Sequence, residues 1–257
     1  TSTQFVFVLL TRSPPLLSVL GKFIGKIVIP VSVQKLKKKD LEYERRLGLG
    51  SSGMVYAARY RNQIVAVKEF YTARNESSEL GQIFFLGMEI MSTLSHPNVV
   101  KLLGAVVESP YLCLVLDHAG KGDLKQYLMV NRTSDWRTYK KDVALGIARG
   151  MKYLHSRTKP IMHLDLKTSN CLITDELEVK ISDFGTARYW TGGGNPHDNQ
   201  TGVEEGLVGS QFYMAPEIIN GDKCTVMSDV YSFGSVLASI GMGGNLKSLF
   251  SMTWKRR

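Results

Sequence analysis

Residues 47–70 read LGLGSSGMVYAARYRNQIVAVKEF, and this stretch decides the fold. The glycines at 48, 50 and 53 form a G-x-G-x-x-G string, which lets a backbone fold over phosphates without Cβ clashes. Dinucleotide-binding sites use the same string, but they need a helix that opens at the third glycine. Here β-branched and aromatic residues at 54–60 and 64–70 flank a polar turn, which predicts two antiparallel strands. We therefore expect the glycine loop to join strands and to cover a phosphate site.

A lysine in the second of these strands supports this interpretation. Lys68 ends the string Val-Ala-Val-Lys at 65–68. An ammonium at this place would reach the α- and β-phosphates of a nucleotide. A lone lysine is more often a solvated surface residue, but the preceding glycine loop favours a phosphate partner.

Three further strings follow in order along the chain. Residues 163–170 read HLDLKTSN, residues 183–185 read DFG and residues 215–217 read APE. Each tripeptide is common by chance, but together with the glycine loop and Lys68 they resemble the eukaryotic protein kinase family. The wording of HPNVVKLLG at 96–104 is most similar to the tyrosine-kinase-like group, such as the mixed-lineage and Roco-type kinases.

The resemblance implies a fold and a chemistry. The fold would be α+β and bilobal, with an antiparallel β-rich N-lobe and a mainly helical C-lobe. Asp165 would orient a substrate hydroxyl and accept its proton, and Lys167 would stabilise the transferred phosphoryl group. Asn170 and Asp183 would supply oxygen ligands to Mg²⁺, a hard cation that shares the phosphates of its nucleotide. We expect Asp165, Lys167 and Lys68 as catalytic residues and ATP and Mg²⁺ as cofactors.

The resemblance also outlines the nucleotide pocket. Main-chain groups of Asp117 and Ala119 would bind adenine at a hinge between the lobes, with Leu116 as the gatekeeper at the back. Apolar side chains that would sandwich the base are equally well explained as simple core. The expected nucleotide-binding residues are Leu47, Gly48, Gly50, Ser51, Gly53, Val55, Ala66, Lys68, Leu116, Asp117, Ala119 and Leu172.

One departure from the family concerns the partner of Lys68. A helix between residues 79 and 94 should carry a glutamate for this lysine, but the family spacing puts Gly87 there. Glu89 is near, yet the residues at +3, +4 and +7 from Gly87 are all apolar, as a core face requires. Two residues turn a helix by about 200°, so Glu89 should face away from Lys68. The missing pair counts against full activity.

Two more departures lie downstream. Leu164 stands where the family has an arginine that receives a phosphate on the activation loop, so loop phosphorylation would have a weaker electrostatic handle. Candidate phosphorylation sites in that loop are Thr191, Thr201 and Ser210.

Apolar residues at 143, 147, 151 and 154 predict one face of a helix over 142–155, before the catalytic loop at 163–170. Residues 228–234 resemble the start of the family's central C-lobe helix, in which Asp229 would accept main-chain N–H groups of the catalytic loop and which the glycines at 241, 243 and 244 would end. The chain also ends soon after this helix. We therefore expect the last C-lobe helices to be missing and Glu217 to lack the arginine that pairs with it.

Composition limits the class and the compartment. The 257 residues are 44% hydrophobic and 21% charged, which is ordinary for a globular protein and argues against collagen, coiled coil or disorder. The net charge of +9 favours anionic partners, although a solvated basic surface explains it equally well. Three cysteines without C-x-x-C spacing argue against a disulfide framework and favour a cytoplasmic location. No uncharged apolar run is long enough to predict a membrane span.

The chain divides into four parts by composition and motif. Residues 1–40 are an apolar and basic leader, in which the KLKKK run could meet acidic lipid headgroups. Weak periodicity favours a poorly ordered leader over this membrane contact. We expect residues 41–116 to form the N-lobe, residues 117–240 the C-lobe through its central helix, and residues 241–257 a divergent tail.

These patterns predict a protein kinase that transfers the γ-phosphate of ATP to protein substrates, at serine and threonine and, less favoured, tyrosine hydroxyls. The alternative is a pseudokinase, an ATP-binding or scaffolding module with little turnover, which Gly87, Leu164 and the short C-lobe motivate. A nucleic-acid or membrane binder rests on charge alone, and we expect no nucleic-acid partner.

Overall fold

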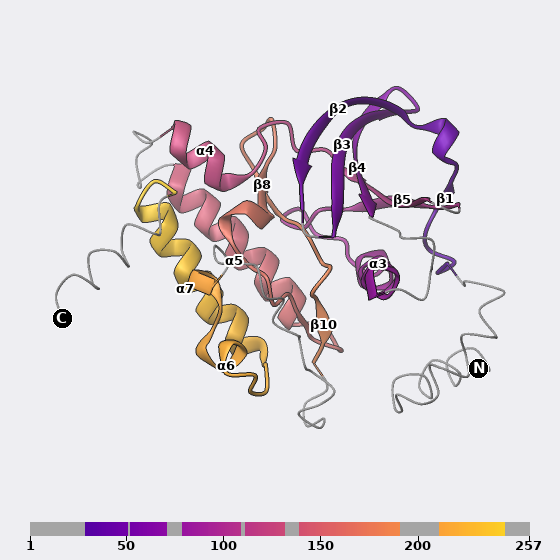
Figure 1. The fold of residues 1–257 in the computed structure, drawn as a ribbon. Helices are drawn as coiled ribbons and strands as arrows, with labels where there is room; N and C mark the ends of the chain where they lie inside the picture. Colours follow the sequence, from indigo (N-terminus) through magenta and orange to yellow (C-terminus); the bar gives the residue numbers. More distant parts are fainter. Residues whose placement is uncertain are drawn as a thin grey trace, which may run out of the picture.

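The structure, a computed structural model, describes residues 29–50, 52–70, 79–108, 111–131, 139–190 and 211–244. The first lobe is a twisted sheet with one helix, and the second lobe is mainly helical (Figure 1). The first lobe contains β1 (Lys35–Leu36), η1 (Lys38–Asp40), β2 (Glu42–Leu49), β3 (Gly53–Tyr60), β4 (Gln63–Phe70), α3 (Glu79–Ser92), β5 (Leu102–Glu108) and β6 (Tyr111–Asp117). The prediction of an α+β, bilobal kinase fold is confirmed.

The six-stranded sheet has the order β1-β5-β6-β4-β3-β2. All neighbouring pairs are antiparallel except β1 with β5. The predicted hairpin at 54–70 is present, with Tyr60 opposite Gln63 and a two-residue turn between them. Arg61 and Asn62 both have positive φ, 46° and 63°, as a tight hairpin turn of this length requires.

The sheet begins before the boundary expected at residue 41. Lys35 and Leu36 pair with β5, and Val33 and Leu36 are buried, 8% and 3% exposed. A two-residue strand has no periodicity to read, which is why the basic KLKKK run looked like part of the leader. Its Lys38 forms an ion pair with Glu69 at 2.9 Å. Residues 1–28, where the rest of the expected leader lies, are outside the described residues.

The second lobe contains α4 (Leu124–Val130), α5 (Lys141–His155), β7 (Ile161–Met162), η3 (Thr168–Asn170), β8 (Cys171–Ile173), β9 (Val179–Ile181), β10 (Arg188–Tyr189), η5 (Gln211–Tyr213), α6 (Pro216–Ile219) and α7 (Val226–Gly241). Helix α5 buries the predicted face of Val143, Ile147, Met151 and Leu154 and packs against α7. Helix α7 opens with a capping box between Thr225 and Ser228 and ends where glycines follow.

One hydrophobic cluster runs through both lobes. It includes Phe84 of α3, Leu114 of β6, Ile147 of α5 and Phe184. Helix α3 packs against β5 and β6, and the sheet and the helical lobe share this core. Across the described residues, no helix is long and apolar enough to span a membrane.

Candidate functional site

The glycine loop joins β2 to β3. The N–H of Gly50 donates to the carbonyl of Gly53 at 2.8 Å, which closes the loop. A Cβ at position 53 would lie 2.1 Å from the carbonyl oxygen of Glu69, so this position accepts only glycine. A Cβ at Gly48 would meet nothing within 4 Å, which leaves that side of the loop open. Ser51 lies outside the described residues.

Lys68 and Asp183 meet across the two lobes. Lys68 is 7% exposed on β4, and its Nζ lies 2.7 Å from Oδ1 of Asp183. Desolvation by the surrounding protein raises the pKa of Asp183, but the Lys68 ammonium and its hydrogen bond, together with His163 and the Gly185 N–H, outweigh it, so the pKa falls below its usual value. Asp183 has φ of 63°, in the left-handed region that few non-glycine residues adopt, although aspartate does so more often than most. The aspartate is therefore ionised and fixed at the boundary between the lobes.

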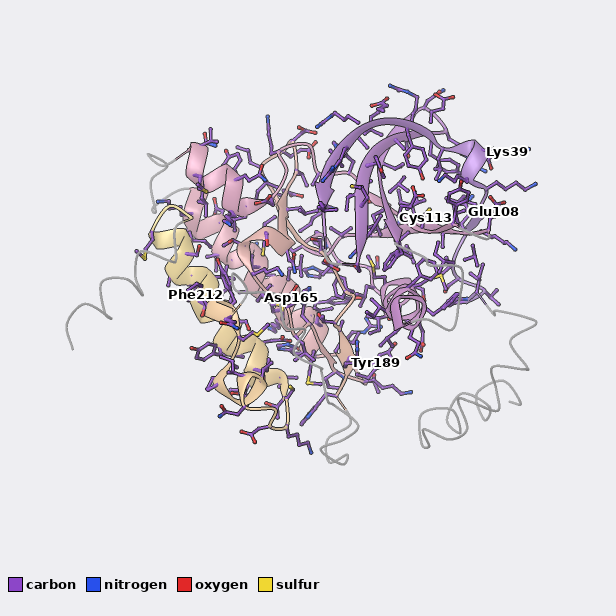
Figure 2. All side chains as sticks on the ribbon, in the orientation of Figure 1. Lys39, Glu108, Cys113, Asp165, Tyr189 and Phe212 are labelled. Carbon is purple, nitrogen blue, oxygen red and sulfur yellow. The ribbon has the colours of Figure 1, made fainter. Side chains whose placement is uncertain are left out.

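The catalytic-loop residues form a compact cluster in the second lobe, where Figure 2 labels Asp165. Lys167 Nζ lies 2.7 Å from Oδ2 of Asp165. The side-chain amide of Asn170 donates to the same oxygen and to the main-chain carbonyl of Asp165, both at 2.8 Å. Because the amide nitrogen is used in this way, the oxygen of Asn170 is the atom left to bind a metal.

Buried Asp229 fixes the start of this loop. Its two oxygens accept the N–H groups of His163 and Leu164, each at 2.8 Å, and His155 Nε2 lies 2.9 Å away. Asp229 is 0% exposed, so these bonds are shielded from water. The expectation that Asp229 accepts main-chain groups of the catalytic loop is confirmed. His155 was not expected there, because nothing in the spacing of residues 155 and 229 links them.

The cluster is tied directly to the segment before Asp183. The carbonyl of Asn170 accepts the N–H of Ser182 at 2.8 Å and its hydroxyl at 3.0 Å. Asn170 and Asp183 are thus oxygen donors on two adjoining segments, η3 and the loop after β9. The described residues contain no group of three or more His, Cys, Asp or Glu side chains that could hold a metal by itself. Two protein oxygens suit a hard cation that takes its other ligands from phosphates and water.

The expected adenine residues lie at the junction of the lobes. The Asp117 N–H donates to the Lys101 carbonyl, and the Ala119 carbonyl accepts from Gly122. These bonds do not use the Asp117 carbonyl or the Ala119 N–H. The carboxylate of Asp117 turns to Lys180, 2.9 Å away, which sequence reasoning missed because nothing in the sequence links the two. Gatekeeper candidate Leu116 is half-buried.

The expected apolar walls of the pocket come from five strands. Ala66 lies opposite Leu116 in the sheet, and Val55 lies opposite Lys68. Ala66 is 8% exposed, while Leu47 at the end of β2 is 37% exposed. Leu172 on β8 and Leu116 on β6 both pack against the main core. Their role against a bound base stays a prediction.

Gly87 lies against the main chain of Phe184, and the apolar face predicted at +3, +4 and +7 from it is buried. A Cβ at position 87 would lie 3.5 Å from the carbonyl oxygen of Phe184. Glu89, two residues further along the helix, is half-buried. Desolvation raises its pKa above the usual value, and the charge of Lys159 offsets only part of this effect. Among the side chains that the structure describes, Lys68 pairs with Asp183 and with no glutamate of α3. The metal-binding candidate is therefore also the counter-charge of the lysine.

Leu164 is buried in an apolar cluster. It is 7% exposed, has φ of 62°, and packs with Met162, Ala215, Ile218 and Cys224. The residue that replaces the family arginine therefore joins the catalytic loop to the segment around α6 through hydrophobic contact. The candidate phosphorylation sites at 191, 201 and 210 lie outside the described residues.

Glu217 has a partner that the sequence analysis did not foresee. The hydroxyl of Ser228 donates to its Oε1 at 2.6 Å. The first turn of α7 thus supplies one hydrogen-bond donor to this acid, while the missing arginine partner of Glu217 stays a prediction. The sequence can indicate that Ser228, in the first turn of a helix, takes part in its cap. It cannot indicate that Ser228 also contacts Glu217, 11 residues away.

Comparison with known proteins places the chain in a family. The model for the protein kinase domain matches residues 41–250, and the chain belongs to the protein kinase domain family. It is 38% identical over 208 residues to stress-activated protein kinase alpha of Dictyostelium discoideum, covering 80% of this chain and 31% of that protein. It is 36% identical over 209 residues to the LRR receptor-like serine/threonine-protein kinase RGI5 of Arabidopsis thaliana, covering 79% and 19%.

A rice relative shows the same relation. The G-type lectin S-receptor-like serine/threonine-protein kinase LECRK1 of Oryza sativa subsp. indica is 34% identical over 211 residues, which cover 80% of this chain and 25% of that protein. The aligned part of the chain thus spans less than a third of the length of these relatives.

Proposed function

We propose that the protein is an ATP-dependent serine/threonine protein kinase. The observation that carries the proposal is the meeting of two lobes at one place. Lys68 of the first lobe lies 2.7 Å from Asp183 of the second, and Asn170 is hydrogen-bonded to the residue that precedes Asp183. A cation, an acid and an amide oxygen at one boundary suit the triphosphate of a nucleotide and its metal.

We assign the metal to Mg²⁺. Asn170 and Asp183 would hold it through oxygen atoms, the ligand type that Mg²⁺ prefers. When bound, the ion would neutralise charge on the phosphates. Lys68 would then bind phosphate oxygens, and the glycine loop, open at Gly48, would cover them with N–H groups.

Asp165 and Lys167 would act on the substrate side. Asp165 would orient a protein hydroxyl and take its proton, while Asn170 holds the carboxylate in place through its amide. Lys167, already 2.7 Å from Asp165, would stabilise charge on the transferred phosphoryl group. The lysine after H-x-D-L and the names of the relatives support serine and threonine over tyrosine, within the tyrosine-kinase-like group. Three buried free cysteines support a reducing, cytoplasmic location.

The test compares Asp165→Asn with the wild type in a radiolabelled phosphate-transfer assay. We expect transfer by the wild type and a loss of about 10²-fold or more in the variant, the usual contribution of a positioned general base. A thermal shift with Mg-ATP should persist in both proteins, because Asp165 is not placed among the nucleotide ligands. Asp40→Asn, which removes an equal charge from an exposed site in the first lobe, should leave both readouts unchanged.

Two outcomes would overturn the assignments. Transfer retained by Asp165→Asn would remove the role given to this residue. A thermal shift with Mg-ATP and no transfer by the wild type would favour the pseudokinase alternative. Gly87 supports that alternative because it stands where the family has the glutamate partner of Lys68.

A further inference from the structure

A hollow in the surface lies beside α5, and none of the catalytic or metal-binding candidates lines it. It has a volume of about 360 Å³ and is lined by His96, Arg149, Lys152, Tyr153, Ser156 and Arg157. A neighbouring hollow of about 220 Å³ shares His96 and extends to Lys101, Asp117 and Lys180 behind the hinge. The larger hollow shares no residue with the candidate active site, so the kinase chemistry does not account for it. The smaller one touches that site only at Asp117, whose main chain is the adenine-binding candidate.

The floor of the larger hollow is a fixed aromatic pair. The rings of His96 and Tyr153 stack with centroids 4.9 Å apart and planes 22° apart. Arg157 donates to the Tyr153 hydroxyl at 2.7 Å, and its guanidinium lies 5.2 Å from the ring centroid. The N–H of Ser95 donates to the same hydroxyl at 2.9 Å. The ring of Tyr153 is therefore held from two sides before any partner binds.

The rim of this hollow is cationic. Arg149 and Lys152 are exposed, three residues apart on α5, and Arg157 is half-buried. Within the described part of the chain, none of the three forms an ion pair with an acid. Desolvation lowers the pKa of His96, which keeps its ring neutral at pH 7 and part of the apolar floor.

The neighbouring hollow adds to the same charge. Its acid, Asp117, is already neutralised by Lys180 at 2.9 Å, while Lys101 contributes another cation. A partner that reaches across both hollows would thus meet positive charge along its whole path and an aromatic floor near one end.

We propose that this surface, lined by His96, Arg149, Lys152, Tyr153 and Arg157, docks an acidic peptide segment of a protein partner. Carboxylates of the segment would bind the rim, where arginine offers a planar pair of donors, and an aromatic side chain would pack on the His96–Tyr153 floor. Charge complementarity and the apolar floor suit this occupant, and the small number of cations favours it over nucleic acid, which usually needs a longer row of phosphate contacts. The proposal does not depend on phosphate transfer.

The test measures binding of a fluorescein-labelled peptide, EEDWEED, to the 257-residue protein by fluorescence anisotropy without nucleotide. The variant Arg149→Glu/Lys152→Glu reverses two exposed rim charges and should weaken binding about tenfold or more, a change that several weak ion pairs supply together. Arg149→Gln/Lys152→Gln, which removes charge without adding repulsion, should weaken it less. The peptide EEDSEED, which lacks the aromatic ring, should bind several-fold more weakly than EEDWEED to the wild type.

A matched control variant tests whether peptide binding depends on this surface or only on the net charge of the protein. Lys125→Glu/Lys141→Glu changes the charge equally at exposed positions away from both hollows and should alter the Kd by less than about twofold. Melting curves and the Mg-ATP thermal shift of every variant check folding.

The proposal is overturned if the rim variants bind the peptide as the wild type does, or if both double charge reversals weaken binding equally. It is also overturned if a single-stranded 20-mer DNA or phosphatidylserine vesicles bind more tightly than the peptide and lose binding in the same rim variant.

Discussion

The two halves of the candidate site differ in what holds their charged groups. In the second lobe, the catalytic loop is fixed by fully buried Asp229, which accepts two main-chain N–H groups. In the first lobe, Lys68 relies on Asp183, which is also a candidate metal ligand. The half with the catalytic loop, here called the loop side, thus has a support that takes no part in the proposed chemistry. Among the described residues, the half with Lys68, here called the lysine side, has no such support.

This difference indicates where catalytic capacity is limited. A buried carboxylate that satisfies main-chain donors keeps its place whether or not a nucleotide is bound, because the unmade bonds would be costly. Under the proposed function, Asp183 would be shared between Lys68 and a metal, and nucleotide binding would rearrange this pair. Gly87 gives α3 no charge with which to hold the lysine meanwhile.

The largest effect is expected at the loop side. Asp229→Ala would leave the N–H groups of His163 and Leu164 buried without an acceptor, each at a cost of about 1–3 kcal/mol. We expect the free energy of unfolding to fall by roughly 3 kcal/mol, and phosphate transfer to be lost with it. Urea denaturation followed by circular dichroism measures the stability.

Asp229→Asn has nearly the same size as the wild type and therefore leaves no cavity. It keeps one acceptor oxygen, so its free energy of unfolding should lie between those of Asp229→Ala and the wild type. If the free energy of unfolding of Asp229→Ala lies within about 0.5 kcal/mol of the wild-type value, other contacts hold the catalytic loop. The proposed difference between the two halves of the site would then be wrong.

Local features of the fold were readable from sequence. The hairpin at 54–70 and the buried face of α5 appeared as predicted, because both depend on periodicity within one element. The end of α7 at Gly241 followed from the glycines after it, two of which have positive φ. The resemblance supplied the rest of the site, including the role of Asp229.

Features that depend on distant contacts were not readable. The positive φ of Leu164 is imposed by the surrounding fold, since leucine rarely adopts it, and no local sequence signal marks the positive φ of Asp183. Lys180 beneath the hinge and Ser228 beside Glu217 meet their partners only after the chain has folded. The sequence identified which residue types belong to the site, while their hydrogen-bond partners required the structure.

A smaller effect is expected at the lysine side. Lys68→Met removes the charge that lowers the pKa of Asp183, so this pKa should rise, because desolvation then acts with less opposition. Affinity for Mg-ATP should fall by about tenfold or more, since an ammonium no longer meets the phosphates. Isothermal titration gives the affinity, and ¹³C-detected titration of the Asp183 carboxyl gives the pKa.

The pH dependence of stability provides an independent check. In the wild type the lowered pKa of Asp183 contributes stability above the unfolded value of about 3.9, and this contribution is lost as pH falls through the folded pKa. The stability difference between wild type and Lys68→Met should therefore be largest near neutral pH and shrink in acid. A difference that is constant from pH 7 to pH 3 would show that the ion pair does not carry it.

The smallest changes are expected at Gly87. They test whether the missing charge at this position limits phosphate transfer. Gly87→Ala should raise the free energy of unfolding by up to about 1 kcal/mol, because a Cβ there meets only ordinary contact and alanine favours a helix. It should not raise phosphate transfer. Gly87→Glu would add a counter-charge on the face next to Phe184 and free Asp183 from Lys68, so transfer should rise several-fold. If the glutamate variant transfers phosphate no faster than the alanine variant, the missing charge on α3 does not limit the lysine side, and the contrast between the two halves of the site is structural only.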